Sequence, residues 1–306
     1  MLVVVALGGN AIQRQAGRGT IDEQREAIRA TSDALGRVVA AGNDLVVTHG
    51  NGPQVGRMMD LDESSGSPHY PLDVHVAETQ GQIGYLLQQE LGAAFARASI
   101  ARSIIAVVTQ VVVDPMDQAF LFPSKPVGPF LDEPAAAALR ARGEAVKELS
   151  PRTWRRVVPS PSPLEIVEAP SIASIVHDGI VPIACGGGGI PVVREDDRYH
   201  GVPAVIDKDL AAACLIGAIG GDVLLILTDV PRVELHHGTA RAEPLDRLPA
   251  RDARQGVANG EFPAGSMGPK VLAAAQAAEH GARAIIASLA DIDEALAGRA
   301  GTEVVA

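Results

Sequence analysis

Short apolar runs alternate with longer segments of helical periodicity along the chain. This alternation predicts a parallel β-sheet covered by helices on both faces, because parallel strands need helical crossovers between them. We expect strands over residues 2–7, 45–48, 104–113, 180–185, 223–228 and 284–288. We expect helices over residues 22–39, 74–95, 164–177, 208–216 and 270–280, the first of them begun by a capping box of Thr20 and Glu23.

The composition changes within residues 114–163, which carry many prolines, three of the five Phe and the only Trp of the chain. Such a shift directly after a strand predicts an inserted protruding subdomain or lid. The simpler alternative is an ordinary long surface loop. A chain of 306 residues is long enough for one large α/β domain, and we expect a single domain over residues 1–306 that contains the insert.

Glycine-rich turns occur at four places next to predicted strands or helices. They are Gly8-Gly9-Asn10, Gly50-Asn51-Gly52, the run from Gly186 to Gly189 with Gly187 and Gly188 at its centre, and the turn from Gly265 to Lys270. Glycine lets a backbone approach a ligand closely and turn its N–H groups onto an anion, helped by the positive end of the following helix. Such turns gather at the carboxyl edge of an open sheet. They predict a site for a phosphate-bearing substrate, and merely tight turns are the alternative.

Other common site motifs are missing from the sequence. It contains no GxxxxGK[ST] and no GxGxxG after the first strand, which excludes a P-loop and a dinucleotide fingerprint. His75 and Glu78 share a helix face without further ligands at metal-binding spacing. Cys185 and Cys214 lack CxxC spacing. We therefore expect no metal held by a side-chain motif and no disulfide framework, as is usual in a reducing cytoplasm.

Lysine is rare in this chain, because 22 of the 26 basic residues are Arg and only four are Lys. A position that keeps Lys against this bias is a candidate for a role that needs a compact ammonium group. Lys125, Lys208 and Lys270 lie beside prolines, aspartates or a glycine turn, and we expect them to contact a transferring phosphate. Lys147 lies in a charged run and is expected to be a solvated surface residue. Clustering by chance is the alternative.

Asp207 and Asp209 flank Lys208 at the start of a predicted helix. The helix dipole favours carboxylates at that place, and this can be their whole role. A carboxylate beside a lysine at a phosphate site can also hold lysines in place or help to position Mg²⁺, without handling a proton itself. Both interpretations stay open at this point.

The formal net charge is −11, and aromatic residues make up 3% of the chain. Such a chain has neither the positive field that attracts nucleic-acid backbones nor the rings on which bases stack, so we expect no nucleic-acid partner. No uncharged apolar stretch reaches the roughly 18 to 20 residues of a membrane span. Residues 1–7 are typical of a strand and not of a signal peptide. We expect a cytoplasmic protein without a membrane partner.

Several longer motifs follow one another in order along nearly the whole chain. They are Ala6 to Ala11, His49 to Gly56, Thr79 to Tyr85, Thr109 to Val111, Lys125 to Phe130, Val157 to Pro161, Cys185 to Pro191, Val205 to Asp209 and Pro263 to Met267. Together they strongly resemble the carbamate kinase family of the amino-acid kinase superfamily. The resemblance implies an α/β fold, namely a three-layer αβα sandwich with a mainly parallel central sheet and a protruding subdomain at the insert. It also implies that the protein is a cytoplasmic homodimer. It also implies reversible phosphoryl transfer between ATP and carbamate, giving ADP and carbamoyl phosphate, with Mg²⁺ on the nucleotide phosphates.

The resemblance further implies a role for individual residues. The loops around carbamate and the transferred phosphoryl group correspond to Gly8, Gly9, Asn10, Gly50, Asn51, Gly52, Gly187 and Gly188. The charge-neutralising lysines correspond to Lys125, Lys208 and Lys270, with Asp209 as the carboxylate that organises them. The nucleotide pocket corresponds to Asp229, Met267, Pro269 and Lys270.

The implied chemistry agrees with the absence of an obvious general base. Carbamate is already an anion, so its oxygen can attack the γ-phosphorus without losing a proton first. The reaction needs in-line alignment and neutralisation of repulsion between two anions. Many amino-acid kinases have a Lys just before the first glycine pair, where this chain has Ala6 and Leu7. We expect Lys125, carried by the insert as a lid, to supply that charge.

The family commonly shows an acid and an aromatic residue shortly after the position of Asp229, whereas this chain has Pro231 to Glu234. The adenine-side contacts are therefore left open. Two other functions also stay open, namely a kinase for another small carboxylate and a non-catalytic nucleotide-binding regulator of the same fold. The expected use of the reaction is to make ATP from carbamoyl phosphate, as in arginine catabolism.

Overall fold

The structure, a computed structural model, describes residues 1–13, 19–65, 69–263, 265 and 267–306. Its main sheet has eight strands in the order β15-β17-β16-β12-β1-β2-β9-β3. In chain order these are β1 (Leu2–Leu7), β2 (Asp44–His49), β3 (Ile104–Ala106), β9 (Val181–Ile183), β12 (Val223–Thr228), β15 (Arg247–Pro249), β16 (Arg283–Ser288) and β17 (Thr302–Val305). Neighbouring strands run parallel except β16 and β17, so the sheet is mainly parallel, as the sequence predicts.

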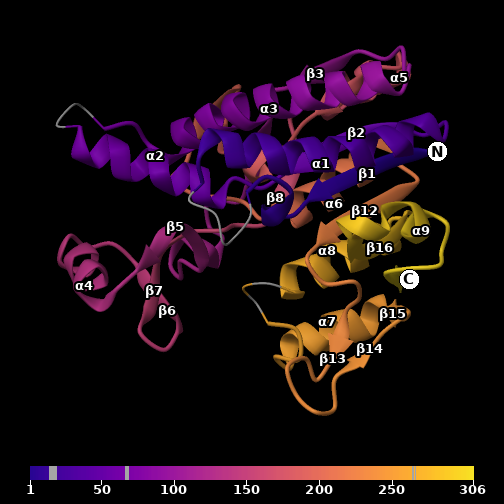
Figure 1. The fold of residues 1–306 in the computed structure, drawn as a ribbon. Helices are drawn as coiled ribbons and strands as arrows, with labels where there is room; N and C mark the ends of the chain where they lie inside the picture. The colour runs from indigo at the N-terminus through magenta and orange to yellow at the C-terminus, as the bar shows by residue number, and fades with distance from the viewer. Residues whose placement is uncertain (14–18, 66–68, 264, 266) are drawn as a thin grey trace.

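Helices cover both faces of this sheet (Figure 1). One face carries α1 (Ile21–Ala40), α3 (Leu72–Arg97) and α9 (Ile292–Leu296), and the other carries α5 (Ala169–His177), α6 (Lys208–Ile219) and α8 (Met267–Glu279). Successive side chains of β1 point to opposite faces of the sheet. Val3 and Val5 pack against α1 and α3 on one face, and Val4 and Ala6 pack against α6 and α8 on the other. A strand buried on both faces must be apolar throughout, as β1 is. The three-layer αβα sandwich is confirmed.

The first helix begins with the capping box that the sequence predicts. The Thr20 hydroxyl accepts a hydrogen bond from the Glu23 N–H at 3.3 Å, and the Glu23 carboxylate accepts one from the Thr20 N–H at 3.0 Å. Two backbone donors that a helix start leaves unpaired are thereby satisfied.

The single strand predicted over residues 104–113 is wrong, because the structure has two strands there. β3 belongs to the main sheet, whereas β4 (Gln110–Val113) joins a second sheet with β8 (Pro163–Ile166), β10 (Ile190–Glu195) and β11 (Arg198–Gly201), in the order β11-β10-β4-β8. At the break, the Gln80 side chain of α3 accepts from the Thr109 N–H at 2.9 Å and donates to the Thr109 carbonyl at 3.1 Å. These bonds take the place of the ladder to β9.

The helix predicted over residues 164–177 begins only at Ala169, because β8 occupies the first part. Pro170 lies in the first turn of α5, where a missing N–H costs little. The Glu168 carboxylate, which precedes this turn, accepts from the backbone N–H of Gln110 at 2.7 Å and from its side chain at 3.0 Å. Helix periodicity in this stretch is therefore overridden by pairing with β4.

Residues 125–158 form a small unit that we call the arm. Its antiparallel sheet has the order β5-β7-β6, with β5 (Lys125–Leu131), β6 (Val146–Ser150), β7 (Thr153–Val158) and, between β5 and β6, helix α4 (Glu133–Ala141). Figure 1 shows the arm projecting from the sandwich beside α2 (Gly52–Ser64). The two are in close contact, since a Cβ added to Gly56 of α2 would lie 1.9 Å from the Gly128 Cα of β5.

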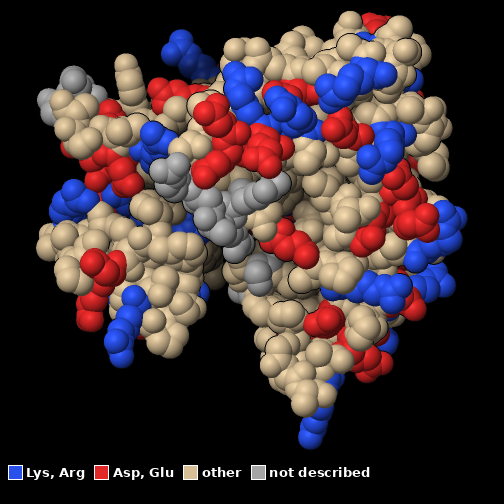
Figure 2. Space-filling view, viewed as in Figure 1, with Lys and Arg blue, Asp and Glu red and all other residues tan. Residues whose placement is uncertain are grey.

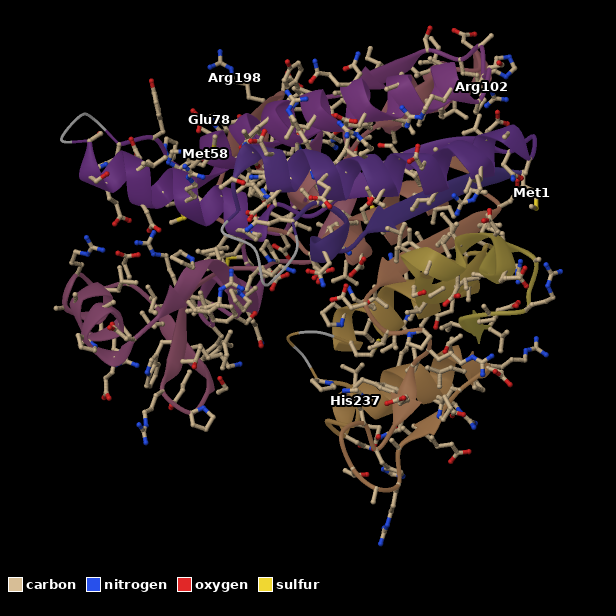
Figure 3. The ribbon with its side chains drawn as sticks, in the orientation of Figure 1. Met1, Met58, Glu78, Arg102, Arg198 and His237 are labelled. Atoms are coloured by element: carbon tan, nitrogen blue, oxygen red, sulfur yellow. The ribbon has the colours of Figure 1, made fainter. Side chains whose placement is uncertain are left out.

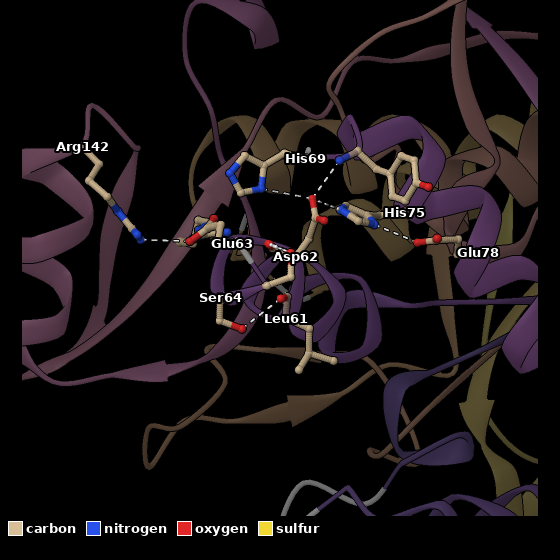
Figure 4. Close-up of polar contacts among 11 residues, drawn as sticks. Leu61, Asp62, Glu63, Ser64, His69, His75, Glu78 and Arg142 are labelled. Atoms are coloured by element: carbon tan, nitrogen blue, oxygen red, sulfur yellow. Dashed lines mark hydrogen bonds and ion pairs between the residues drawn. The ribbon is translucent and has the colours of Figure 1, made fainter. Parts of the chain in front are cut away.

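The C-terminal end of α2 makes polar contacts on two sides (Figure 4). Glu63 faces the arm and forms an ion pair with Arg142 at 3.1 Å. Asp62 faces the other way, with one carboxylate oxygen 3.5 Å from both His69 Nδ1 and His75 Nε2. Helix α2 thus connects the arm to the start of α3.

A second projection contains β13 (Glu234–Leu235), β14 (Glu243–Pro244) and α7 (Ala250–Ala258), and we call it the C-terminal lobe. Figure 2 shows the molecule hollowed between the arm and this lobe, with acidic and basic side chains mixed over the visible face. In the part of the chain that the structure describes, no helix has both the length and the apolar character needed to cross a bilayer.

Candidate active site

Three neighbouring strands bring their carboxyl ends to one edge of the main sheet. β1 lies between β12 and β2, with Leu7 opposite His49 and Ala6 opposite Ile226. The turn after β1 therefore lies between the turns after its neighbours. A Cβ on Gly8 would lie 2.7 Å from the Leu227 carbonyl oxygen, so only glycine fits there.

The predicted phosphate loops continue from these strand ends. Gly9 and Asn10 begin a short 3₁₀ turn, Gly9–Ala11, and a Cβ on Gly9 would meet no atom within 4 Å. Gly52 is the first residue of α2, and its Cβ position lies 3.8 Å from the Pro126 carbonyl oxygen of the arm. Gly50 packs against the stem of Lys208, whose Cδ lies 3.3 Å from the Gly50 Cβ position. The loops after β1 and β2, the arm and α6 therefore surround one place.

The glycines after β9 are packing positions in this structure. Gly187 and Gly188 have φ values of 68° and 92°, which favour glycine. A Cβ on Gly187 would lie 2.3 Å from Asn51 Nδ2, and one on Gly188 would lie 2.2 Å from the Ile206 carbonyl oxygen. The two glycines thus let Asn51 and the chain entering α6 come together.

The three candidate lysines meet at the start of α6. Lys208 Nζ is paired with Asp209 Oδ1, and Lys270 Nζ lies 2.9 Å from Oδ2 of the same carboxylate. Lys125 Nζ reaches in from the arm and lies 2.5 Å from Asp207 Oδ2. Three ammonium groups and two carboxylates leave one net positive charge here, in a chain whose net charge is −11. We call these five residues the lysine centre.

The fourth lysine lies elsewhere. Lys147 is exposed on β6, opposite Arg155 of β7, and none of the ion pairs of the lysine centre includes it. The structure therefore separates Lys147 from the other three lysines, as the sequence predicts.

Burial and mutual charge set the protonation of the lysine centre. Burial lowers the pKa of Lys208 to about 8, against the opposing effect of Asp209. Burial acts on Lys270 in the same direction, but the Asp209 charge and hydrogen bond outweigh it and its pKa is raised. Burial acts to raise the pKa of Asp207, yet the charges of Lys125 and Lys208 prevail and hold it well below its usual range. Asp207 is therefore ionised at neutral pH.

His49 lies directly beneath the loops and is buried. Its Nδ1 is 3.0 Å from the Gly50 carbonyl oxygen, and burial, with a smaller contribution from Lys208, lowers its pKa to about 4. The ring is thus neutral at pH 7 and donates from Nδ1 to that carbonyl. Sequence reasoning missed His49 as a supporting residue, although its position just before Gly50 was a usable signal.

A cavity of about 220 Å³ borders the lysine centre at Lys270. Asp229 and Met267 line it, as do Phe262 and, from the C-terminal lobe, His237, which is labelled in Figure 3. Arg232 and Glu234 also line this cavity, so the segment that departs from the family pattern belongs to its wall. Pro269 lies in the first turn of α8 and is not among the lining residues. Ala264 and Ser266, from the neighbouring glycine turn, lie outside the described residues.

A larger cavity of about 920 Å³ lies where the start of α1, α2 and the arm meet. Gln54 and Arg57 of α2 line it from one side, and Gly128 and Pro129 of the arm line it from the other. These residues follow Gly52 and Lys125 closely in the chain. One cavity therefore borders the lysine centre at Lys270, and the other is lined by residues that follow Gly52 and Lys125 in the chain.

No group of three His, Cys, Asp or Glu side chains among the described residues is arranged to hold a metal ion. The carboxylates of Asp207 and Asp209 are engaged by ammonium groups. Cys185 and Cys214 are free, and burial raises the pKa of both thiols.

Comparison with known proteins places this arrangement in context. The model of the amino acid kinase family matches residues 1–288. The carbamate kinase of Pyrococcus horikoshii is 46% identical over 308 residues, which cover 99% of this chain and 98% of that protein. A carbamate kinase-like protein of Escherichia coli, YqeA, is 42% identical over 99% of this chain and 98% of its own length. The structure of a Giardia lamblia carbamate kinase bound to AMP-PNP has a TM-score of 0.90 and 39% identity, covering 99% of this chain and 98% of that one.

Proposed function

This chain belongs to the amino acid kinase family and is similar over its full length to carbamate kinases, and we propose that it transfers a phosphoryl group reversibly between ATP and carbamate. The products of the forward reaction are ADP and carbamoyl phosphate. The observation that carries the proposal is the lysine centre, in which Lys125, Lys208 and Lys270 converge on two aspartates beside the glycine loops. The full-length similarity to carbamate kinases supports the choice of substrate.

The centre suits phosphoryl transfer between two anions. The carbamate oxygen attacks the γ-phosphorus in line, and no side chain has to remove a proton from it. Lys125 and Lys208 offset the repulsion between carbamate and the γ-phosphoryl group, while the Asp209 carboxylate holds Lys208 and Lys270 at fixed positions. The N–H groups of the turns that follow β1 and β2 align the acceptor.

The nucleotide occupies the cavity beside Lys270 in this proposal. Asp229 and Met267 line that cavity together with Lys270, which supports a contact of Lys270 with the phosphate chain. A similar solved structure holds AMP-PNP, which supports a nucleotide as ligand. Mg²⁺, bound on the nucleotide phosphates, supplies further neutralisation of charge.

Three properties of the whole protein complete the proposal. The physiological direction is ATP synthesis from carbamoyl phosphate in arginine catabolism, the location is cytoplasmic, and the protein is a homodimer.

The dimer interface is proposed on the side of the edge strand β3. Apolar side chains are exposed there, namely Tyr85 of α3, Ile105 and Val108. Sedimentation equilibrium tests the dimer, and a monomer at micromolar concentration contradicts it.

The activity is tested with ADP, Mg²⁺ and carbamoyl phosphate in an assay coupled to ATP formation. ATP above background supports the proposal, and no ATP from protein that still binds ADP contradicts it and favours a regulator. The forward reaction, with ATP as phosphoryl donor, is run side by side with carbamate, acetate and amino acids as acceptors. A faster rate with another carboxylate assigns a different substrate within the same family.

A further inference from the structure

Asp207 takes part in two different interactions through its two carboxylate oxygens. Oδ1 accepts hydrogen bonds from the N–H groups of Asp209 at 2.9 Å and Leu210 at 3.4 Å, and so caps the N-terminus of α6. Oδ2 accepts from Lys125 Nζ at 2.5 Å. Because the cap fixes the carboxylate to the helix, the ammonium group of Lys125 is directed to a fixed point.

This ion pair crosses from the arm to the sandwich. Within the described residues, the arm forms ion pairs with the rest of the chain at two places, Lys125 with Asp207 and, further out, Arg142 and Arg156 with α2. Only the first of these touches the lysine centre. The side chain of Lys125 is 28% exposed and that of Asp207 is 9% exposed, so the lysine has a path to solvent that the carboxylate lacks.

The charges of the lysine centre explain why Lys125 needs this partner. Asp209 already holds Lys208 and Lys270, and a third ammonium group beside them is repelled unless a second carboxylate lies next to it. Asp207 is that carboxylate. Without the charge of Asp207, repulsion from Lys208 and Lys270 is expected to move the Lys125 ammonium group towards solvent together with the start of β5.

We propose that Asp207 is a positioning residue, which docks the Lys125 ammonium of the arm onto the start of α6 and so keeps the arm at the phosphoryl-transfer centre. The inference rests on the proposed function for its kinetic part and on geometry alone for its structural part. The simpler role, a helix cap and nothing more, makes different predictions.

The Asp207→Asn variant separates the two roles, because asparagine caps a helix about as well as aspartate but carries no charge. Loss of the ion pair is expected to lower kcat by about tenfold or more. Amide hydrogen exchange at the Lys125 end of β5 is expected to become faster, while exchange in the first turn of α6 stays unchanged. The matched control is Asp132→Asn, since Asp132 caps α4 by accepting from the Ala135 N–H at 2.9 Å and belongs to the arm but not to the site.

A second background tests that Asp207 acts through Lys125. In a Lys125→Met protein the ion pair is already absent, so adding Asp207→Asn is expected to cause no further change in the exchange of β5. Additive effects of the two substitutions on β5 contradict the inference. A rate loss in Asp207→Asn without faster exchange in β5 contradicts it as well, and so does an effect on α6 alone.

The exchange measurements do not depend on catalysis. If the unaltered protein makes no ATP from carbamoyl phosphate, the proposed function fails, and exchange in β5 still decides whether Asp207 docks the arm. If the protein is an active carbamate kinase and β5 is unaffected in Asp207→Asn, the proposed function stands and the positioning role fails.

Discussion

Single side chains decide the chemistry at the lysine centre, because the space around each ammonium group is small. Lys208 passes within 3.3 Å of the Gly50 Cβ position, and Lys270 and Lys125 each reach one carboxylate oxygen. A guanidinium group is planar, wider and has its charge spread over three nitrogens. Arginine therefore keeps the charge at these positions but not the geometry.

The first prediction compares three lysine-to-arginine variants. Lys125→Arg and Lys270→Arg are expected to lower kcat by about two orders of magnitude or more, because alignment at the phosphorus is lost while the fold persists. Lys147→Arg is the control and is expected to match the parent protein. Steady-state kinetics and circular dichroism measure both properties, and equal activity in all three variants contradicts the distinction among the lysines.

The second prediction concerns pH. Burial lowers the pKa of Lys208 to about 8, so its ammonium form, which in the proposed mechanism neutralises the phosphoryl group, is lost as the pH rises through about 8. The value of kcat/KM for carbamoyl phosphate is expected to fall above that pH, since this ratio reports groups of the free enzyme. A ratio that is constant from pH 7 to well above 9 contradicts the role of Lys208.

The third prediction is a pH dependence of stability through His49. The pKa of His49 is lowered to about 4 in the folded protein, from an ordinary value of 6.5. Between these two pH values the imidazole is protonated in the unfolded chain but neutral in the folded protein. The contribution of His49 to the free energy of unfolding is fully present above pH 6.5. It is lost as the pH falls towards 4, which lowers the free energy of unfolding by roughly 3 kcal/mol. Urea unfolding at several pH values measures it. The decline is expected to be shallower in His49→Gln, and an equal decline in both proteins contradicts the assignment.

At the scale of elements, the contact between α2 and the arm is the joint on which the site depends. Gly56 and Gly128 touch at the backbone, and Arg156 of β7 lies 2.7 Å from Glu63 of α2 and 2.6 Å from Glu144. The guanidinium of Arg156 is almost fully buried between these carboxylates. The helix that follows the glycine turn after β2 therefore also supports the arm.

The fourth prediction uses two glycines inside helices. Gly56→Ala forces α2 and β5 apart and is expected to destabilise the protein by about 1–3 kcal/mol and to lower kcat/KM. Gly81→Ala in α3 meets no atom within 4 Å and is expected to stabilise by about 0.5–1 kcal/mol without a kinetic effect. Thermal unfolding and kinetics check both, and similar behaviour of the two variants contradicts the role of the joint.

Elements with regular patterns were predictable, and those made by distant contacts were not. The apolar β1 and the capping box at Thr20 follow from local rules and agree with the structure. The break between β3 and β4 depends on Gln80, which bonds to Thr109 from 29 residues away, and no local pattern marks it. The lysines were recognisable because Lys is rare in the composition. The partner of Lys125 lies 82 residues further along the chain, and the sequence alone did not indicate whether it is Asp207 or Asp209.

For the whole molecule, a ligand that binds only the folded form adds to its stability. The fifth prediction is that ADP with Mg²⁺ at a hundred times its dissociation constant stabilises the protein by about 2.7 kcal/mol, which raises Tm by a few degrees. Lys270→Met is expected to reduce this shift, because Lys270 borders the cavity proposed for the nucleotide. Arg251→Met, on the exposed face of α7, is the control and keeps the shift. A full shift in Lys270→Met contradicts the placement of the nucleotide.

The position of β1 in the middle of the main sheet has a consequence for synthesis on the ribosome. β1 pairs with β2 on one side and with β12 on the other, and β12 is translated more than 200 residues later. A nascent chain can form the first of these pairings early, but the opposite edge of β1 stays open until β12 has emerged. The growing chain therefore exposes one edge of an apolar strand for most of its translation, until β12 closes it.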